Sequence, residues 1–156
     1  MSTLIANRVA RLRPRAIAAL FCTCLFLGVA LPATAQPTVA NGEWKSIQRV
    51  IAQQRAALVA GNDRKAFGYA TPAIQAEFGD PTSFMAMVQT GYSALITARY
   101  VEFLEGAVID GIVIQPLRLI DSDNTVRVAL YTMVKQKNGT WRISGCRIAP
   151  STVQAT

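Results

Sequence analysis

Few side chains of this sequence are able to carry out acid–base or nucleophilic chemistry. The chain contains no histidine, which excludes serine–histidine and cysteine–histidine catalysis and histidine-ligated zinc. Glu102 lies inside a predicted strand and is the weak candidate for a catalytic acid or base, although a solvent-facing position is favoured for it. The aspartates lie in predicted caps or turns, where bonding to the local backbone explains them: Asp80, Asp110, Asp121 and Asp123.

A second set of residues predicts a ligand pocket. An apolar cavity with a few polar tips is the usual way to hold a small molecule, and we expect aromatic and methionine side chains to line it. The candidates are Tyr92, Tyr131, Met85, Met87 and Trp141. Packing in the core is the alternative, and it is favoured for Trp141 and for the nearby Phe84. For the two tyrosines both roles stay open, because a buried hydroxyl needs a hydrogen-bond partner.

Other reactive or charged groups predict structure more than chemistry. We expect Cys146 to be buried and inert, with an interchain disulfide or a redox role as the alternative. Residues 121–124 resemble a fragment of a calcium loop without its remaining ligands, which favours a hairpin turn. Arg127, Arg142 and Arg147 suggest a strip for an anion, but a solvated sheet face is favoured. We therefore expect no metal site and no cofactor.

The first 35 residues have the three parts of a secretory signal peptide. Basic residues precede an uncharged apolar run at residues 16–31, and a small-x-small sequence follows it. This run is shorter than the ~20 residues of a permanent membrane helix, so an uncleaved anchor is the weaker alternative. We expect cleavage between Ala35 and Gln36, and a periplasmic or secreted protein that meets the membrane only during export.

Cleavage changes what the composition implies. The formal net charge falls from +7 to +3, because four arginines and no acidic residue leave with the signal peptide. A net charge of this size without a dense basic tract does not favour nucleic-acid binding. Two of the three cysteines, Cys22 and Cys24, leave as well, which excludes an intramolecular disulfide in the mature chain.

Hydrophobic periodicity predicts helices in the first half of the mature chain. From Glu43 onward, apolar residues at helical spacing indicate one long helix. Cap signals at Asn62, Thr71 and Asp80 then predict shorter helices, the last two with proline in the first turn. Gly91 is the predicted C-cap of the last of them.

Alternation of β-branched and polar residues predicts strands in the second half. Turn sequences join them, and Asn138-Gly139 is the strongest hairpin signal. An antiparallel four-stranded sheet packed on one side by the helices is the simplest closure, so the predicted fold class is α+β. The predicted strands are residues 99–105, 112–120, 125–135 and 140–148. The predicted domain is 43–150, between a linker at 36–42 and a C-terminal tail at 151–156.

Two strands carry further detail. In the fourth strand the apolar residues before and after Ser144-Gly145 would lie on opposite faces if the strand were regular. One extra residue at Ser144-Gly145 places them on the same face. We therefore predict a β-bulge, which glycine tolerates best. In the third strand the second face mixes Ala129, Tyr131 and Met133 with charged residues, so we expect a partner or a curled sheet to cover it partly. The first face of that strand is apolar: Val126, Val128, Leu130 and Val134.

The sequence GTWRISGC at residues 139–146 resembles the ending of an exported bacterial family called domain of unknown function 4864, as do Thr71-Pro72-Ala73-Ile74 and the glycine at Gly91. The resemblance covers about residues 44–150, with Gly145 and Cys146 in its most specific part. Helices followed by a curved sheet are also similar to the NTF2-like (SnoaL-like, cystatin-like) superfamily. This resemblance implies a cone with a pocket between sheet and helices, but no activity.

Three hypotheses of function follow. The leading one is an exported, non-catalytic domain that binds a small apolar ligand or a protein partner, through the pocket or the half-apolar sheet face. The second is an acid–base enzyme of the isomerase or cyclase type that the superfamily implies, using Glu102 and a tyrosine. The third is a homodimer built on the sheet.

Overall fold

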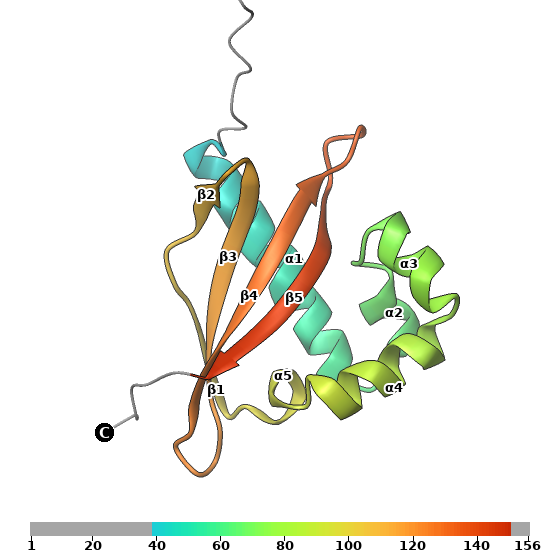
Figure 1. Cartoon of the computed structure of the whole chain (residues 1–156), viewed down its shortest axis with the longest axis vertical. Coiled ribbons are helices and arrows are strands. Elements are labelled where there is room, and N and C mark those ends of the chain that lie inside the picture. The colour runs from blue at the N-terminus through green and yellow to red at the C-terminus, as the bar shows by residue number, and fades with distance from the viewer. Residues whose placement is uncertain (1–38, 151–156) are drawn as a thin grey trace, which may run out of the picture. The chain divides into compact units, whose positions relative to one another are not determined.

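Figure 1 shows the computed structural model of the chain, which describes residues 39–150. The predicted signal peptide at residues 1–35, its cleavage site and the predicted tail at 151–156 lie outside the described residues and stay predictions. Between residues 39 and 150, helices are followed by an antiparallel sheet, which confirms the α+β fold class. In this part of the chain, no helix has the length and apolar character needed to cross a membrane.

The described residues contain five helices. The first begins at Asn41, inside the predicted linker, and its buried residues Ile47, Ile51 and Leu58 follow the predicted helical stripe. The fifth helix is not predicted by periodicity, because its four residues are too few to show a period. The helices are α1 (Asn41–Val59), α2 (Asp63–Phe67), α3 (Pro72–Phe78), α4 (Pro81–Gly91) and α5 (Ala94–Thr97).

Side-chain caps fix where α2 and α4 begin. The Asn62 side-chain oxygen accepts a hydrogen bond from the backbone N–H of Lys65 at 3.0 Å. The Asp80 carboxylate accepts hydrogen bonds from the backbone N–H groups of Thr82 and Ser83 at 2.8 and 2.9 Å. Each cap satisfies N–H groups that the first turn of a helix leaves without an internal partner. The predicted caps at Asn62 and Asp80 are therefore confirmed, whereas Thr71 stands at the N-cap of α3 without a side-chain capping hydrogen bond.

The sheet has five strands, one more than predicted, and it is curved (Figure 1). The first predicted strand ends early, at Phe103, and a separate short strand follows; both pair with β3 along one edge. A three-residue strand shows too little alternation to be predicted. The order across the sheet is β1-β3-β4-β5, with β2 beside β3. The strands are β1 (Tyr100–Phe103), β2 (Ala107–Ile109), β3 (Ile112–Ile120), β4 (Val126–Lys135) and β5 (Trp141–Pro150).

Two side chains fill the break between β1 and β2. Gln115 is fully buried on β3, and its Nε2 donates a hydrogen bond to the backbone oxygen of Leu104 at 2.7 Å. This side chain satisfies a backbone group in the break, where no strand pairs. Trp44, in the first turn of α1, lies over Gly106, where a Cβ would come within 2.2 Å of the indole ring. The close approach of the ring therefore requires glycine at this position.

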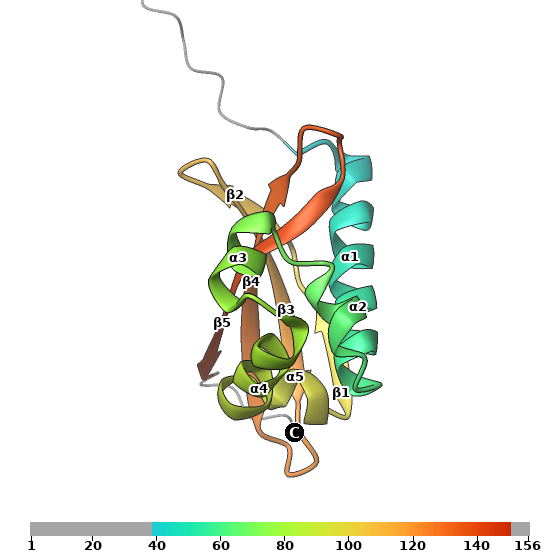
Figure 2. The ribbon, with the colours of Figure 1, turned by 90° about the vertical axis from the view of Figure 1, so that its right-hand side faces the viewer.

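Helix α1 packs against one face of the sheet, and no helix of the described residues lies on the opposite face (Figures 1 and 2). The second face of β4 is covered, as expected, and the chain's own helices provide the cover. Its mixed face, with Ala129, Tyr131 and Met133, belongs to the core beneath the chain's own helices and needs no partner. Its apolar face points outward, where Val134 is 44% exposed. The alternation in the sequence does not show which face of β4 points toward the core, because both faces are rich in apolar residues.

The predicted bulge in β5 is confirmed. Thr132 pairs with Gly145 and the next pair is Met133 with Ile143, so Ser144 is the extra residue. The extra residue restores the phase, and apolar residues before and after it pack toward the same core. A Cβ at Gly145 would lie 2.7 Å from Oγ1 of Thr132, which explains why glycine fits best there.

Candidate functional site

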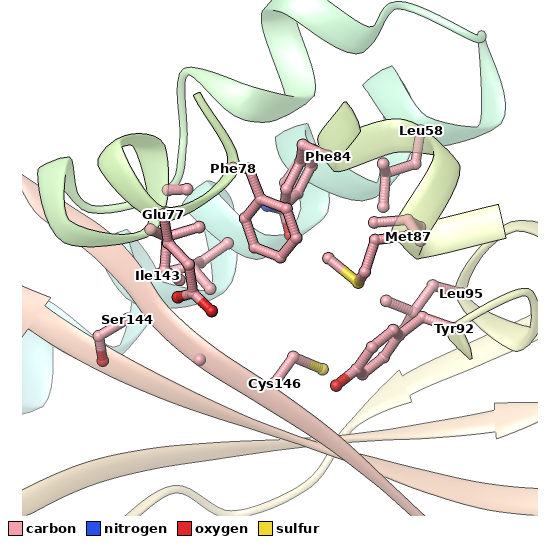
Figure 3. A pocket seen from close by; sticks show the side chains of 15 residues that line it. Leu58, Glu77, Phe78, Phe84, Met87, Tyr92, Leu95, Ile143, Ser144 and Cys146 are labelled. Carbon is pink, nitrogen blue, oxygen red and sulfur yellow. The ribbon is translucent and has the colours of Figure 1, made fainter. Parts of the chain in front are cut away.

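A cavity of about 350 Å³ lies between α3, α4 and the bulged part of β5. Figure 3 shows its lining, to which the C-terminal half of α1 and the short α5 also contribute. Most of the lining side chains are apolar, and a few polar ones lie among them. The size and the composition are those of a site for a small molecule.

Aromatic side chains from α3 and α4 form one wall of the cavity. Phe78 and Phe84 meet edge to face, with their ring centroids 5.8 Å apart. Phe84 also packs on Phe67 of α2 at 5.3 Å, so the wall is anchored in the core. Met87, one turn further along α4, adds a flexible apolar side chain. The wall thus combines fixed rings with one adaptable side chain.

β5 forms the opposite wall at its bulge. Residues of a regular strand alternate between faces, but four successive residues line the cavity here: Ile143, Ser144, Gly145 and Cys146. The bulge is what brings neighbouring residues to one side. The outer edge of β5 also holds the chain before α3. The N–H of Ile143 donates to the oxygen of Tyr69 at 3.0 Å, and the oxygen of Ile143 accepts from the N–H of Thr71 at 2.8 Å. The bulge and this contact together fix the distance between α3 and the sheet.

Glu77 of α3 is the charged residue among the side chains that line the cavity. Figure 3 shows its carboxylate directed toward the space between α3 and β5. The residue is exposed, so the carboxylate lies at the rim and stays hydrated. The ion pairs of the described residues join other groups and leave Glu77 without a basic partner.

The other polar groups of the lining are partly committed to the protein. Gln54 is buried, and its Nε2 donates to the backbone oxygen of Ala66 at 3.4 Å. The Ser144 hydroxyl donates to Oγ1 of Thr132 at 3.2 Å. Gln54 and Ser144 therefore have less freedom than Glu77 to interact with a ligand.

Tyr92 and Cys146 meet at one end of the cavity. α4 extends through Gly91, and Tyr92 is its C-cap, one residue later than predicted. Figure 3 shows the hydroxyl end of Tyr92 directed toward the Cys146 thiol. Cys146 is a free cysteine, and burial raises the pKa of its thiol to about 12. The thiol therefore stays protonated at neutral pH and is a poor nucleophile.

Tyr131 does not line the cavity, but it pairs across the sheet with Cys146, which does. Its side chain is fully buried next to the Cys146 thiol, and among the described residues no group lies in good hydrogen-bonding geometry to its hydroxyl. Burial raises the pKa of this hydroxyl well above its ordinary range, so it carries no charge. Tyr131 is thus a core residue whose polar atom is unsatisfied.

Of the five predicted pocket residues, two line the cavity and three do not. Tyr92 and Met87 line the cavity. Met85 and Tyr131 are buried in the core instead. Trp141 lies away from the cavity at the start of β5, where its ring centroid is 6.0 Å from Nζ of Lys135.

Glu77 and Phe78 were not among the predicted site residues, although both line the cavity. Helical spacing carries a signal for Glu77, because it follows Ile74 by one turn and shares its side of α3. That signal is weak on a seven-residue helix without a fully buried residue. Gly145 and Cys146 were predicted as structural residues, and they also line the cavity.

Glu102 lies away from this cavity. It is on the outer face of β1, and its Oε2 is 2.6 Å from Nη1 of Arg118 on β3. The Glu102 side chain is 43% exposed, so it does not face inward. The geometry gives the predicted acid–base role of this residue no support.

A smaller hollow near the start of β4 is polar. Its Asp121 carboxylate pairs with Arg127 and accepts a hydrogen bond from the Thr97 hydroxyl at 3.4 Å. Residues 121–124 form the predicted turn, closed by a hydrogen bond from the N–H of Asp121 to the oxygen of Thr125 at 3.0 Å. In the part of the chain that the structure describes, no three acidic or cysteine side chains come together to hold a metal ion.

Comparison with known proteins gives a family without an assigned activity. The chain belongs to the family described as domain of unknown function (DUF4864), whose profile matches residues 40–156. This match confirms the family resemblance of the sequence. No curated protein and no solved structure matches the chain. The wider NTF2-like assignment therefore stays a prediction.

Proposed function

We propose that this member of the DUF4864 family is a binding domain that holds a small apolar ligand in the cavity between α3, α4 and β5. The observation that carries the proposal is the cavity itself, which is mainly apolar and has few polar groups. A water-sized group occupies ~30 Å³ in a liquid. The cavity of about 350 Å³ is thus suited to roughly a dozen non-hydrogen atoms.

The chemistry around the cavity favours binding over catalysis. Glu102 lies on the outer face of the sheet, paired with Arg118. The Cys146 thiol is protonated at neutral pH, because burial raises its pKa to about 12. The sequence has no histidine to act as a general base.

Native mass spectrometry of the protein purified from its own cells tests the proposal. We expect a fraction of the protein to carry a bound mass that organic solvent removes. Met87→Trp fills the cavity and should abolish this mass. Val59→Trp adds the same side chain at an exposed position of α1 and should leave it unchanged. A ligand-free protein, or binding that both variants retain, would contradict the proposal.

A second candidate function is self-association through the outer face of the sheet. In the described residues no helix covers this face, and its apolar side chains include Val128 and Leu130 of β4. β3 and β4 have 9 and 10 residues, which corresponds to a length of about 30 Å, and four strands are about 19 Å wide. Two such faces bury on the order of 1,100 Å², just above the ~1,000 Å² of a specific interface. We therefore propose that a second copy of the chain covers this face of the sheet.

The molar mass in solution, measured by sedimentation equilibrium, tests the second candidate. We expect the wild-type protein to be a dimer. Leu130→Lys places a charge at the centre of the face and should give a monomer. Val59→Lys changes an exposed apolar residue of α1 and should leave the dimer intact. A monomeric wild-type protein would rule out this interface.

We also propose that the domain acts outside the cytoplasm. The support comes from the sequence of residues 1–35, with its basic start, apolar run and small-x-small cleavage sequence. Intact mass and N-terminal sequencing of the protein from its own cells should give a chain that begins at Gln36. A chain that retains Met1 would overturn cleavage, and recovery from the cytoplasm would overturn export.

A further inference from the structure

We propose that the cavity selects a ligand with a cationic amine at one end of an apolar body. This inference rests on the proposed binding function and specifies the chemistry of the ligand. It is carried by the charge of the lining: Glu77 contributes a carboxylate, and among residues 39–150 no lysine or arginine lines the cavity. The cavity volume of about 350 Å³ limits the whole molecule to roughly a dozen non-hydrogen atoms.

The position of Glu77 at the rim suits an amine better than a fully buried position would. An exposed carboxylate keeps its hydration in the free protein, so the chain bears no cost for burying an unpaired charge. When an apolar ligand fills the cavity, its amine end is left at the rim beside this carboxylate. The apolar walls exclude water on one side, which strengthens the attraction between the two charges.

Aromatic rings add to this preference for a cation. Figure 3 shows Phe78 next to Glu77 and Tyr92 across the cavity. The face of an aromatic ring attracts a cation that lies within ~6 Å of its centroid. Phe78 and Tyr92 line the same cavity as Glu77, so a cation inside it meets aromatic side chains as well as the carboxylate. The apolar body of the ligand then extends between Met87 and β5.

A ligand with a carboxylate end is disfavoured by the negative charge of the lining. Its charge would meet the carboxylate of Glu77, with no basic side chain in the lining to compensate it. The Ser144 hydroxyl does not replace one, because it already donates to Thr132. The cavity thus discriminates among molecules of the same length by the charge at their end.

Three ligands of matched length test the inference: decylamine, decanol and decanoate, each titrated into the purified protein by isothermal calorimetry below its micelle concentration. We expect decylamine to bind about 1.4- to fivefold more tightly than decanol, the range of an exposed ion pair, and decanoate to bind most weakly. The preference for the amine should shrink at ~1 M salt, where charges are screened beyond ~3 Å.

Two carboxylate variants separate the role of Glu77 from a general effect of charge. Glu77→Gln should make decylamine and decanol bind equally, while decanol binding stays unchanged. Glu105→Gln removes the same charge from an exposed residue outside the lining and should keep the preference for the amine. Thermal unfolding of both variants checks that the fold is intact.

The outcomes distinguish this inference from the proposed function. Equal binding of all three ligands, abolished by Met87→Trp, would overturn the preference for a cation and leave the apolar binding function standing. Binding of none of them would overturn both. An amine preference that survives Glu77→Gln would refute the role of this carboxylate.

Discussion

Replacing Gly106 with alanine places a methyl group against the ring of Trp44. A Cβ built at Gly106 lies 2.2, 2.6 and 2.8 Å from three atoms of the ring, whereas ordinary contacts begin at 3.4 Å. The ring must therefore withdraw by about 1.2 Å, the difference between the ordinary and the shortest distance. The ring is packed against the core, so either it rotates out of this position or the first turn of α1 or the chain between β1 and β2 moves.

Overpacking of this kind costs ~1–3 kcal/mol. The upper end of this range applies, because the clash involves several atoms of a rigid ring. We therefore expect a loss of about 3 kcal/mol in the free energy of unfolding. For a domain of this size, each kcal/mol corresponds to ~4 °C in Tm. The Tm of Gly106→Ala should therefore fall by about 12 °C.

Thermal unfolding followed by circular dichroism measures this effect, and a double-mutant cycle identifies its cause. Trp44→Leu replaces the ring with a smaller side chain, so Gly106→Ala should cost at least ~1 kcal/mol less in that background. Gly42→Ala is the control, because no atom lies within 4 Å of a Cβ at this helical glycine. An unchanged Tm for Gly106→Ala, or strictly additive effects with Trp44→Leu, would refute the reasoning.

Three further predictions concern the residues around the cavity. Gly145→Ala should cost ~1–2 kcal/mol, because its Cβ displaces the Thr132 hydroxyl; urea unfolding should show most of this cost removed in a Thr132→Ala background. Tyr131→Phe should leave the free energy of unfolding unchanged or raise it by up to ~1 kcal/mol, since the deleted hydroxyl has no hydrogen-bond partner. A loss of ~1 kcal/mol in urea unfolding would contradict this prediction. Burial raises the pKa of Cys146 from about 9 to about 12, so the folded state holds this proton more tightly than the unfolded state. This contribution to stability is complete below pH 9 and is lost as the pH rises to 12; the Tm of the wild type should thus fall more steeply over that range than the Tm of Cys146→Ala.

Features of the fold that depend on neighbouring residues were predictable from the sequence. Asn62 and Asp80 cap helices as expected, because a capping side chain binds N–H groups only two or three residues away. The bulge at Ser144-Gly145 was predictable as well, since a loss of phase within one strand is a local signal.

Features that depend on which elements meet were not predictable in the same way. Both faces of β4 carry apolar residues, so the alternation did not show that Tyr131 faces the core and Leu130 faces outward. Glu77 has only a weak local signal, its helical spacing from Ile74; it lines the cavity because the short α3 lies opposite the bulge of β5. The break before β2 likewise depends on Trp44, which is distant in the sequence.

The two edges of the sheet have a consequence for aggregation. On one edge, β1 and β2 are short and are separated by a break that the Gln115 side chain fills. On the other, β5 is bent by its bulge and already pairs with the chain at Ala70. A long, regular row of unpaired backbone groups is what another chain needs to add a strand and to start a fibre. In the described sheet the short strands of one edge and the bulge of the other interrupt such a row, so growth by strand addition is disfavoured.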